Sequence, residues 1–171
     1  MTKGVGHGEI EAKIRELKPD YVATTAITCT SPDALTVLET AKRVNKGITT
    51  IIGGIHSTFM YDEVFQLANG NLDFVIRGEG ETTTKELLTA LESGGDVANV
   101  RGIAYREGNK VVKTPGRPLM PASQLDSLPQ AWDLLEWEDY VYFIFPNSRL
   151  GAIATSRGCD KDCTFCSQRI F

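Results

Sequence analysis

The apolar positions of the first hundred residues follow two alternating periods. Residues 9–18 place isoleucine and leucine side chains on one helical stripe, and a Pro-Asp pair ends the segment. Residues 21–29 (YVATTAITC) are β-branched and nearly uncharged, which is typical of a strand covered on both faces. This pattern predicts a helix followed by a buried strand, with Cys29 as a small core residue at the end of the strand.

The alternation continues to residue 113. Ser31-Pro32-Asp33 is a typical helix start, and Gly47 closes that helix. The later elements that we expect are a strand over 48–52, a helix over 58–68, a strand over 73–76, a helix over 81–92, and a hairpin of strands 100–106 and 110–113. Strands and helices that alternate over short connections predict an α/β fold with a parallel, Rossmann-like (flavodoxin-like) sheet.

Composition and charge narrow the possible partners. The chain has 171 residues, of which 42% are hydrophobic and 23% charged, as in an ordinary globular protein with room for one domain and an additional segment. A net charge of -4 gives no electrostatic reason to expect nucleic acid. No apolar run approaches the roughly 20 residues of a membrane span, and the first residues do not form a hydrophobic signal region. We therefore expect a cytoplasmic protein whose partners are small molecules or other proteins.

Three loops at the carboxyl ends of the expected strands are the candidate ligand site, because parallel sheets bind ligands at that edge. They contain Thr28, the run Gly53-Gly54-Ile55-His56, and the run Arg77-Gly78-Glu79-Gly80-Glu81. Paired glycines after a strand allow a ligand to approach the backbone, although a tight turn needs them equally. Acidic residues at a helix start are also favoured by the macrodipole, and a loop histidine more often caps than ligates.

Residues 114–149 have a different character. Five prolines, two tryptophans and a run of acidic residues indicate a linker that packs onto a neighbouring domain, with Trp132, Leu135 and Trp137 as its anchors. Residues 150–155 (LGAIAT) then predict a short apolar strand. The cysteine-rich end of the chain follows directly.

Cys159, Cys163 and Cys166 form a C-x3-C-x2-C motif. Three thiolates at this spacing can bind three irons of a [4Fe-4S] cluster and leave the fourth iron open. A structural zinc site would require a fourth ligand, and no histidine or cysteine follows Cys166. The clustering also differs from the dispersed cysteines of a secreted disulfide framework. We therefore favour an iron-sulfur cluster, with zinc and a chance pattern as the alternatives.

The cysteine motif, with Phe165 before its third cysteine, resembles that of the radical S-adenosylmethionine (SAM) enzymes. The upstream element order, with its GG-x-H and GEGE loops, resembles the cobalamin-binding domain that precedes the radical domain in one large subgroup. The stretch from residue 148 onward is most similar to the anaerobic magnesium-protoporphyrin IX monomethyl ester oxidative cyclases and their relatives. The resemblance implies a cobalamin-binding domain over 1–113, a linker over 114–149, and the first strand and cluster loop of a radical SAM barrel over 150–171.

The resemblance also implies cofactors and site residues. The open iron of the cluster would chelate SAM and reductively cleave it to a 5'-deoxyadenosyl radical, so that Cys159, Cys163 and Cys166 are the metal ligands. A reductant such as flavodoxin or ferredoxin and a small-molecule substrate, a porphyrin among the candidates, would be the partners. Arg157 would neutralise the anionic cluster or remain solvated. The residues that would contact cobalamin are Thr28, Gly53, Gly54, His56, Gly78 and Glu79.

Two family features have no match in this sequence. The first is the strand that opens family cobalamin domains, with a D-x-H-x-x-G-like loop that can supply the lower cobalt ligand. That strand is central in such sheets, so its loss would leave a gap between its neighbours. The second is the set of later barrel strands. We expect a fragment that does not turn over substrate alone. Its parent would be a tetrapyrrole cyclase or, alternatively, a radical SAM C-methyltransferase or methylthiotransferase; a non-catalytic corrinoid or metal-binding module is the remaining alternative.

Overall fold

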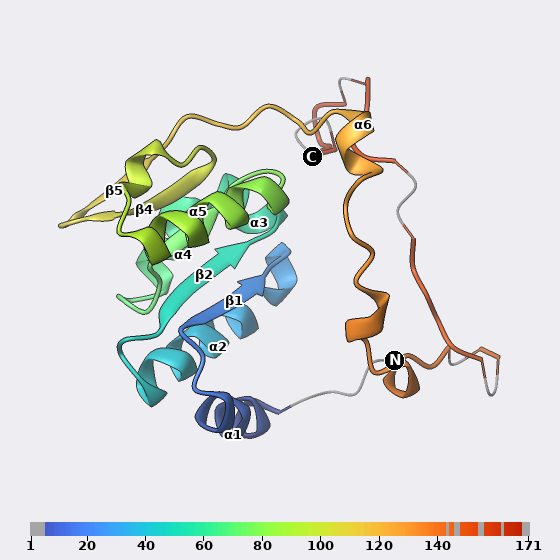
Figure 1. Ribbon diagram of the computed structural model, residues 1–171, viewed down its shortest axis with the longest axis horizontal. Helices are drawn as coiled ribbons and strands as arrows, with labels where there is room; N and C mark the ends of the chain where they lie inside the picture. The colour runs from blue at the N-terminus through green and yellow to red at the C-terminus, as the bar shows by residue number, and fades with distance from the viewer. Residues whose placement is uncertain (1–5, 143, 146–147, 154–155, 162, 169–171) are drawn as a thin grey trace.

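A five-stranded sheet forms the centre of the computed structural model, which describes residues 6–142, 144–145, 148–153, 156–161 and 163–168 (Figure 1). Its strand order is β1-β2-β3-β4-β5. The first three strands are parallel, and the last two add an antiparallel hairpin. The strands are β1 (Tyr21–Thr25), β2 (Thr49–Gly53), β3 (Phe74–Ile76), β4 (Ile103–Glu107) and β5 (Lys110–Lys113). This mixed sheet with helices confirms the predicted α/β, Rossmann-like class.

The helices fall close to their predicted positions, with one exception. They are α1 (His7–Leu17), α2 (Ser31–Val44), α3 (Ile55–Phe59), α4 (Tyr61–Leu67), α5 (Glu81–Ser93) and α6 (Ala122–Leu125), with 3₁₀ turns η1 (Thr28–Thr30), η2 (Val97–Asn99), η3 (Trp132–Leu134) and η4 (Trp137–Asp139). The single helix predicted over 58–68 is wrong. Met60, with φ -108° and ψ 29°, lies outside helical geometry and separates α3 from α4.

The core lies on both faces of the sheet. On one face, Ile52 and Val75 pack in a cluster with Leu38 of α2 and Phe65 of α4. On the other, strand residues including Ile51 pack with residues of α5. Ile51 and Ile52 belong to different clusters because successive strand residues point to opposite faces. Because both faces of the central strands are covered, the sequences of these strands are continuous apolar runs.

The expectations for the first strand need correction. β1 pairs directly with β2 over five residues, from Tyr21↔Thr49 to Thr25↔Gly53, so the described sheet has no gap between them. β1 also ends earlier than predicted, and Ala23 and Thr25 are exposed because they lie on the face where α5 packs against the later strands instead. Cys29 is exposed rather than buried, since the chain has already turned into η1.

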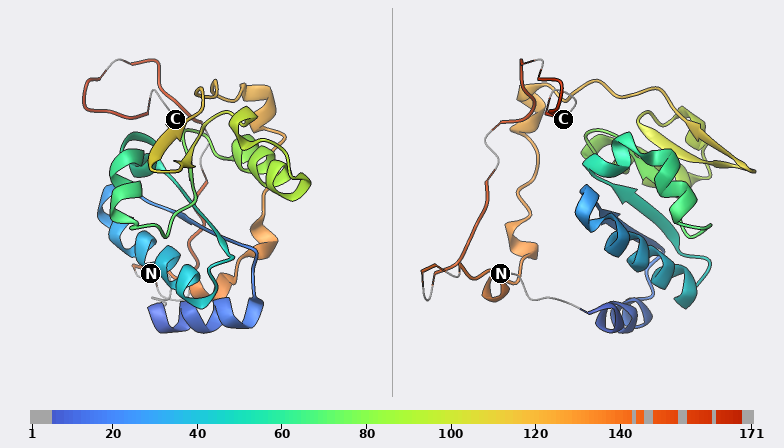
Figure 2. Two further views of the ribbon diagram at one scale, coloured as in Figure 1. Left: turned by 90° about the vertical axis from the view of Figure 1, so that its left-hand side faces the viewer. Right: turned by 180° about the vertical axis from the view of Figure 1, so that it is seen from behind.

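Beyond β5 the chain leaves the sheet as a linker. It crosses to α6, descends alongside the domain and returns, so that the cysteine loop lies at the same end as α6 (Figures 1 and 2). The predicted anchors Trp132 and Trp137 stack on each other, with ring centroids 5.4 Å apart. The predicted strand over 150–155 is wrong for 150–153, which form no strand, and residues 154–155 lie outside the described residues. A single bridge, Val141↔Arg149, pairs the two linker segments instead.

The described helices are all too short or too polar to traverse a lipid bilayer.

Candidate functional site at the carboxyl edge of the sheet

Gly54 brings the first two loops of the carboxyl edge into direct contact. Its φ is +93°, and a Cβ at this position would lie 2.6 Å from the carbonyl oxygen of Ala26. The amide of Ala26 donates to the carbonyl of Gly53 at 3.0 Å, and the amide of His56 donates to the carbonyl of Ala26 at 3.2 Å. A glycine is therefore required because the backbone of the neighbouring loop occupies the space of a side chain.

Thr58 joins the second loop to the third. Its buried hydroxyl donates to the carbonyl of Gly54 at 2.9 Å and accepts the amide of Gly78 at 3.0 Å. His56 Nδ1 lies 3.3 Å from the hydroxyl oxygen of Thr28, which adds a side-chain contact between the first and second loops. Thr58 is missing from the predicted site, although its position two residues after the GG-x-H run was the available signal. The predicted residues that the structure gathers here are Thr28, Gly53, Gly54, His56 and Gly78.

Three buried hydroxyls around these loops make no hydrogen bond within the described residues. They belong to Thr24 of β1, Ser31 of α2 and Ser57 of α3. The Ser57 side chain lies directly after the GG-x-H run, and Ser57 is fully buried. Leaving a buried polar group unpaired costs roughly 1–3 kcal/mol, so these hydroxyls are unsatisfied positions within the interior beside the loops.

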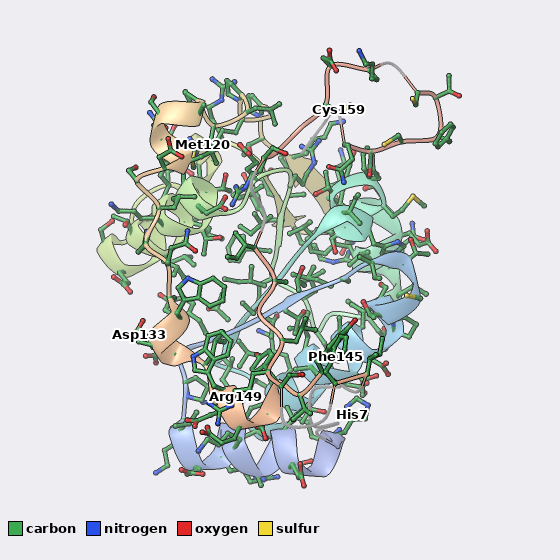
Figure 3. All side chains as sticks on the ribbon, turned by 90° about the vertical axis from the view of Figure 1, so that its right-hand side faces the viewer. His7, Met120, Asp133, Phe145, Arg149 and Cys159 are labelled. Carbon is green, nitrogen blue, oxygen red and sulfur yellow. The ribbon has the colours of Figure 1, made fainter. Side chains whose placement is uncertain are left out.

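Glu79 belongs to the third loop, and its partners lie in the linker and the cysteine loop. Its side chain is only 8% exposed; the carboxylate accepts a hydrogen bond from the backbone amide of Met120 and lies 3.6 Å from Arg157 Nη1. Glu81 Oε1 lies 2.6 Å from Arg157 Nη2. Met120 and Cys159 accordingly lie at one end of the molecule, and His7 and Arg149 at the other (Figure 3).

The charges of this contact reinforce each other. Partial burial by itself would raise the pKa of Glu81, but the hydrogen bond from Arg157 and the backbone amides hold that pKa below its usual value. The same bond to Glu81 raises the pKa of Arg157. Both groups are therefore charged at neutral pH. The sequence predicted that Arg157 either neutralises a cluster or is solvated. In the structure its guanidinium is paired with Glu79 and Glu81.

A large open cleft of about 1340 Å³ lies between α5 and the linker. Its lining includes Lys85 of α5, Trp132 of the linker and Ile153 of the segment that follows it, and also Glu81 and Arg157. The linker is thus held to the domain near its ends and stands away from it in the middle.

The three motif cysteines lie on one loop as free thiols. Cys159 and Cys163 are exposed and Cys166 is half-buried, and the amide of Cys166 donates to the carbonyl of Cys163 at 3.1 Å. Within the described residues, no three His, Cys, Asp or Glu side chains lie close enough to hold a metal ion. The donor set is chemically suited to iron, because it consists of three thiols in eight residues, but the loop is not preformed around a centre.

Comparisons with known proteins give a family match for the sheet domain and relatives that match nearly the whole chain. A family model described as B12 binding domain matches residues 4–88. The anaerobic magnesium-protoporphyrin IX monomethyl ester cyclase of Rubrivivax gelatinosus is 43% identical over 98% of this chain and 30% of its own length. An uncharacterized methyltransferase of Pyrococcus horikoshii is 37% identical over 99% of this chain and 36% of its own length. The chain therefore spans about a third of the length of these relatives.

A solved structure shares the fold. The radical SAM methyltransferase of Kitasatospora setae, determined with cobalamin and a [4Fe-4S] cluster bound, matches 67% of this chain and 22% of its own with a TM-score of 0.57. The sequence identity is 18%, so this match supports the fold alone.

Proposed function

Residues 4–88 belong to the B12-binding domain family, and from this premise we propose that the chain is the cobalamin-binding and cluster-binding part of a radical SAM enzyme. The observation that carries the proposal is the position of the cysteine loop. Glu79 and Glu81, in the loop that follows β3, hold Arg157, two residues before Cys159. The same loop is joined to the loop of Gly54 through the Thr58 hydroxyl. A corrinoid site and a cluster site would then face the same edge of one sheet.

The carboxyl edge would hold cobalamin. The loops of Thr28, Gly53 and Gly78 are already connected by hydrogen bonds, so a ligand would meet a formed surface. Glu79 would act at the border of this site, where its carboxylate contacts the linker.

The cysteine loop would hold a [4Fe-4S] cluster through Cys159, Cys163 and Cys166. When bound, the cluster and SAM would supply the electron and the radical precursor for hydrogen abstraction from an unactivated carbon. The part of this chain is to supply three thiolates and to keep one iron free of protein ligands.

The relatives supply two candidate reactions for the whole protein. The match to the Rubrivivax cyclase supports cyclisation of a magnesium-protoporphyrin monomethyl ester. In this proposal a flavodoxin or ferredoxin would be the reductant. The match to the Pyrococcus methyltransferase supports a second candidate, methyl transfer. Residues outside this chain would select between them.

The first experiment is anaerobic reconstitution with iron and sulfide, followed by metal analysis and EPR with and without SAM. We expect about four irons per chain and an EPR signal that SAM perturbs. Zinc in place of iron, or a cluster whose signal is indifferent to SAM, would contradict the proposal.

Cysteine variants give this experiment a matched control. Cys163→Ser should abolish cluster assembly, because two remaining motif thiols cannot hold the cube. Cys29→Ser removes an equally exposed thiol outside the motif and should leave the iron content unchanged. Equal losses of iron in both variants would indicate nonspecific binding to thiols.

A further inference from the structure

We propose that Glu79 and Glu81 are positioning residues that hold the cysteine loop and the linker against the carboxyl edge of the sheet. They act on two segments that are distant in sequence, through the backbone amide of Met120 and the guanidinium of Arg157. We call this set of contacts the acidic clamp. The contacts of the clamp are independent of the proposed function. The further consequence, that the clamp fixes the distance between a bound cobalamin and a bound cluster, rests on that function.

The burial of Glu79 is the strongest argument for the clamp. Its side chain is only 8% exposed, and a buried carboxylate is costly unless its oxygens are partnered. Oε2 accepts the amide of Met120, and Oε1 faces Arg157. Both partners come from outside the domain that contains Glu79. The burial itself therefore depends on the docked linker and cysteine loop.

The helix dipole accounts for these acids only in part. The Glu79 carboxylate accepts the amide of Met120 in the linker, and no side chain caps the start of α5. Glu81 lies in the first turn of that helix, where the backbone amides of Gly80 and Glu81 help to lower the pKa of its carboxyl, but the hydrogen bond from Arg157 lowers that pKa more. The two carboxylates, separated only by Gly80, thus meet one planar guanidinium, whose several donors suit such double contact.

The position of Arg157 gives the clamp its effect. Only Gly158, with φ +74°, lies between Arg157 and Cys159, so fixing the guanidinium fixes the point where the cysteine loop begins. The turn that carries both glutamates is itself tied to the second loop by the bond from the Gly78 amide to Thr58. A continuous path of contacts therefore connects the GG-x-H loop with the first motif cysteine.

A neighbouring ion pair provides a matched control. Arg117, at the start of the linker, pairs with Glu86 of α5 and donates to the hydroxyl of Thr83. This pair joins the same helix to the same linker, and within the part of the chain that the structure describes it has no hydrogen bond or ion pair to the cysteine loop. Glu86→Gln should loosen the start of the linker and leave Arg157 held.

Trypsin can test the clamp directly, because its cleavage site is Arg157 itself. The protease must insert the arginine side chain into its own acidic pocket, so a guanidinium held by Glu79 and Glu81 is protected. The measured quantity is the initial cleavage rate after Arg157, divided by the rate after Arg149, in the whole chain without added cofactors. Arg149 makes one exposed ion pair with Glu138 and serves as the internal reference.

We expect Glu81→Gln and Glu79→Gln each to raise this ratio roughly fivefold, since cleavage follows the population of the released state. Arg157→Lys keeps the charge and the cleavage site but cannot bridge two carboxylates as well, so its ratio should also rise. Glu86→Gln should leave the ratio unchanged. An unchanged ratio in both clamp variants would overturn the proposal. An equal rise in Glu86→Gln would do the same, because it would indicate general loosening of α5.

A spectroscopic measurement separates positioning from simple stability. In chain loaded with cob(II)alamin and reduced cluster, the spin coupling between the two centres should be well defined in wild type and heterogeneous in Glu81→Gln, with equal iron content. Heterogeneity in Glu81→Gln but not in Glu86→Gln supports the clamp, and identical spectra in all three would contradict it. Failure to load cofactors would count against the proposed function alone, because the trypsin ratio needs none.

Discussion

Residues 6–113 and the described residues of 114–168 differ in where their apolar side chains lie. In the first region, Leu38, Phe65 and Leu87 are fully buried between the sheet and its helices. In the second, Leu134 is 78% exposed, Ile153 73% and Phe165 91%. The first region has a core of its own, whereas the second meets it through polar contacts that include those at Arg117, Met120 and Arg157. Sequence hydrophobicity alone does not distinguish a core from a surface that needs a partner.

The largest expected effect would show that the two regions unfold separately. Leu38→Ala should lower the free energy of unfolding of the sheet domain by about 2–5 kcal/mol, because it opens a cavity in the core. Leu134→Ala should change it by less than about 0.5 kcal/mol. Urea unfolding can distinguish the regions, because far-UV circular dichroism follows the sheet domain and both tryptophans lie in the linker.

Leu38→Ala should therefore shift the dichroism transition and leave the fluorescence transition in place. If both transitions coincide and shift together, the two regions do not unfold separately and the chain is one cooperative unit.

A smaller effect concerns the loops of the carboxyl edge. Gly54→Ala should destabilise the domain by roughly 2–4 kcal/mol, because strain at positive φ adds to the collision with Ala26. Gly70 is the control, since its φ is +85° but a Cβ there meets nothing within 4 Å. Gly70→Ala should cost only the conformational strain of about 1 kcal/mol.

Thermal unfolding and titration with cobalamin would measure both glycine variants. Equal destabilisation by the two would show that the close approach of the first two loops is not needed. Loss of cobalamin binding in Gly54→Ala alone, in chain that is still folded, would tie the proposed site to that approach.

The smallest effect depends on pH and involves α1. Hydrogen bonds from Arg43 and Arg15 hold the pKa of Glu11 below its ordinary value of 4.5. A lowered pKa in the folded state means that the stabilisation is fully present above the ordinary value and is lost as the pH falls through the folded value. Glu11→Gln should thus be less stable than wild type at neutral pH; the difference should begin to shrink as the pH falls past 4.5 and vanish below the lowered pKa of the folded state.

Denaturant midpoints measured across this range provide the test, and 1 M salt should reduce the difference by screening. Glu9 lies on the same helix and makes no ion pair among the described residues. Glu9→Gln therefore changes the net charge of the helix by the same amount and serves as the control. A pH-independent difference for Glu11→Gln would mean that the ion pairs contribute nothing.

The elements of the sheet domain were predictable because their signals are local. The helical stripe of residues 9–18 and the apolar run of 48–52 depend on periodicity, and the structure places α1 and β2 there. Local signals fail to predict the bounds of an element where a tertiary contact determines them. The helix predicted over 58–68 breaks at Met60, which keeps Thr58 in position to contact Gly54 and Gly78. Periodicity carries no information about that contact.

The candidate site was predictable in part for the same reason. Glycine pairs and a histidine after a strand are visible in the sequence, and the structure gathers Gly53, Gly54 and His56 at one edge. The partner of Glu81 was not predictable, because Arg157 lies 76 residues further along by the difference of their numbers. The apolar stretch 150–153 failed as a strand because strand formation needs a neighbouring strand, and the described residues offer it none.

The hydroxyl of Thr58 has a thermodynamic consequence. One side chain donates to Gly54 and accepts from Gly78, so two loops lose conformational freedom while the chain folds. A ligand that binds there afterwards does not have to order them, and the entropy that it would otherwise lose is retained as affinity. Thr58→Val, with the same shape but no hydroxyl, would leave those loops to be ordered by the ligand and would make its binding more strongly dependent on temperature.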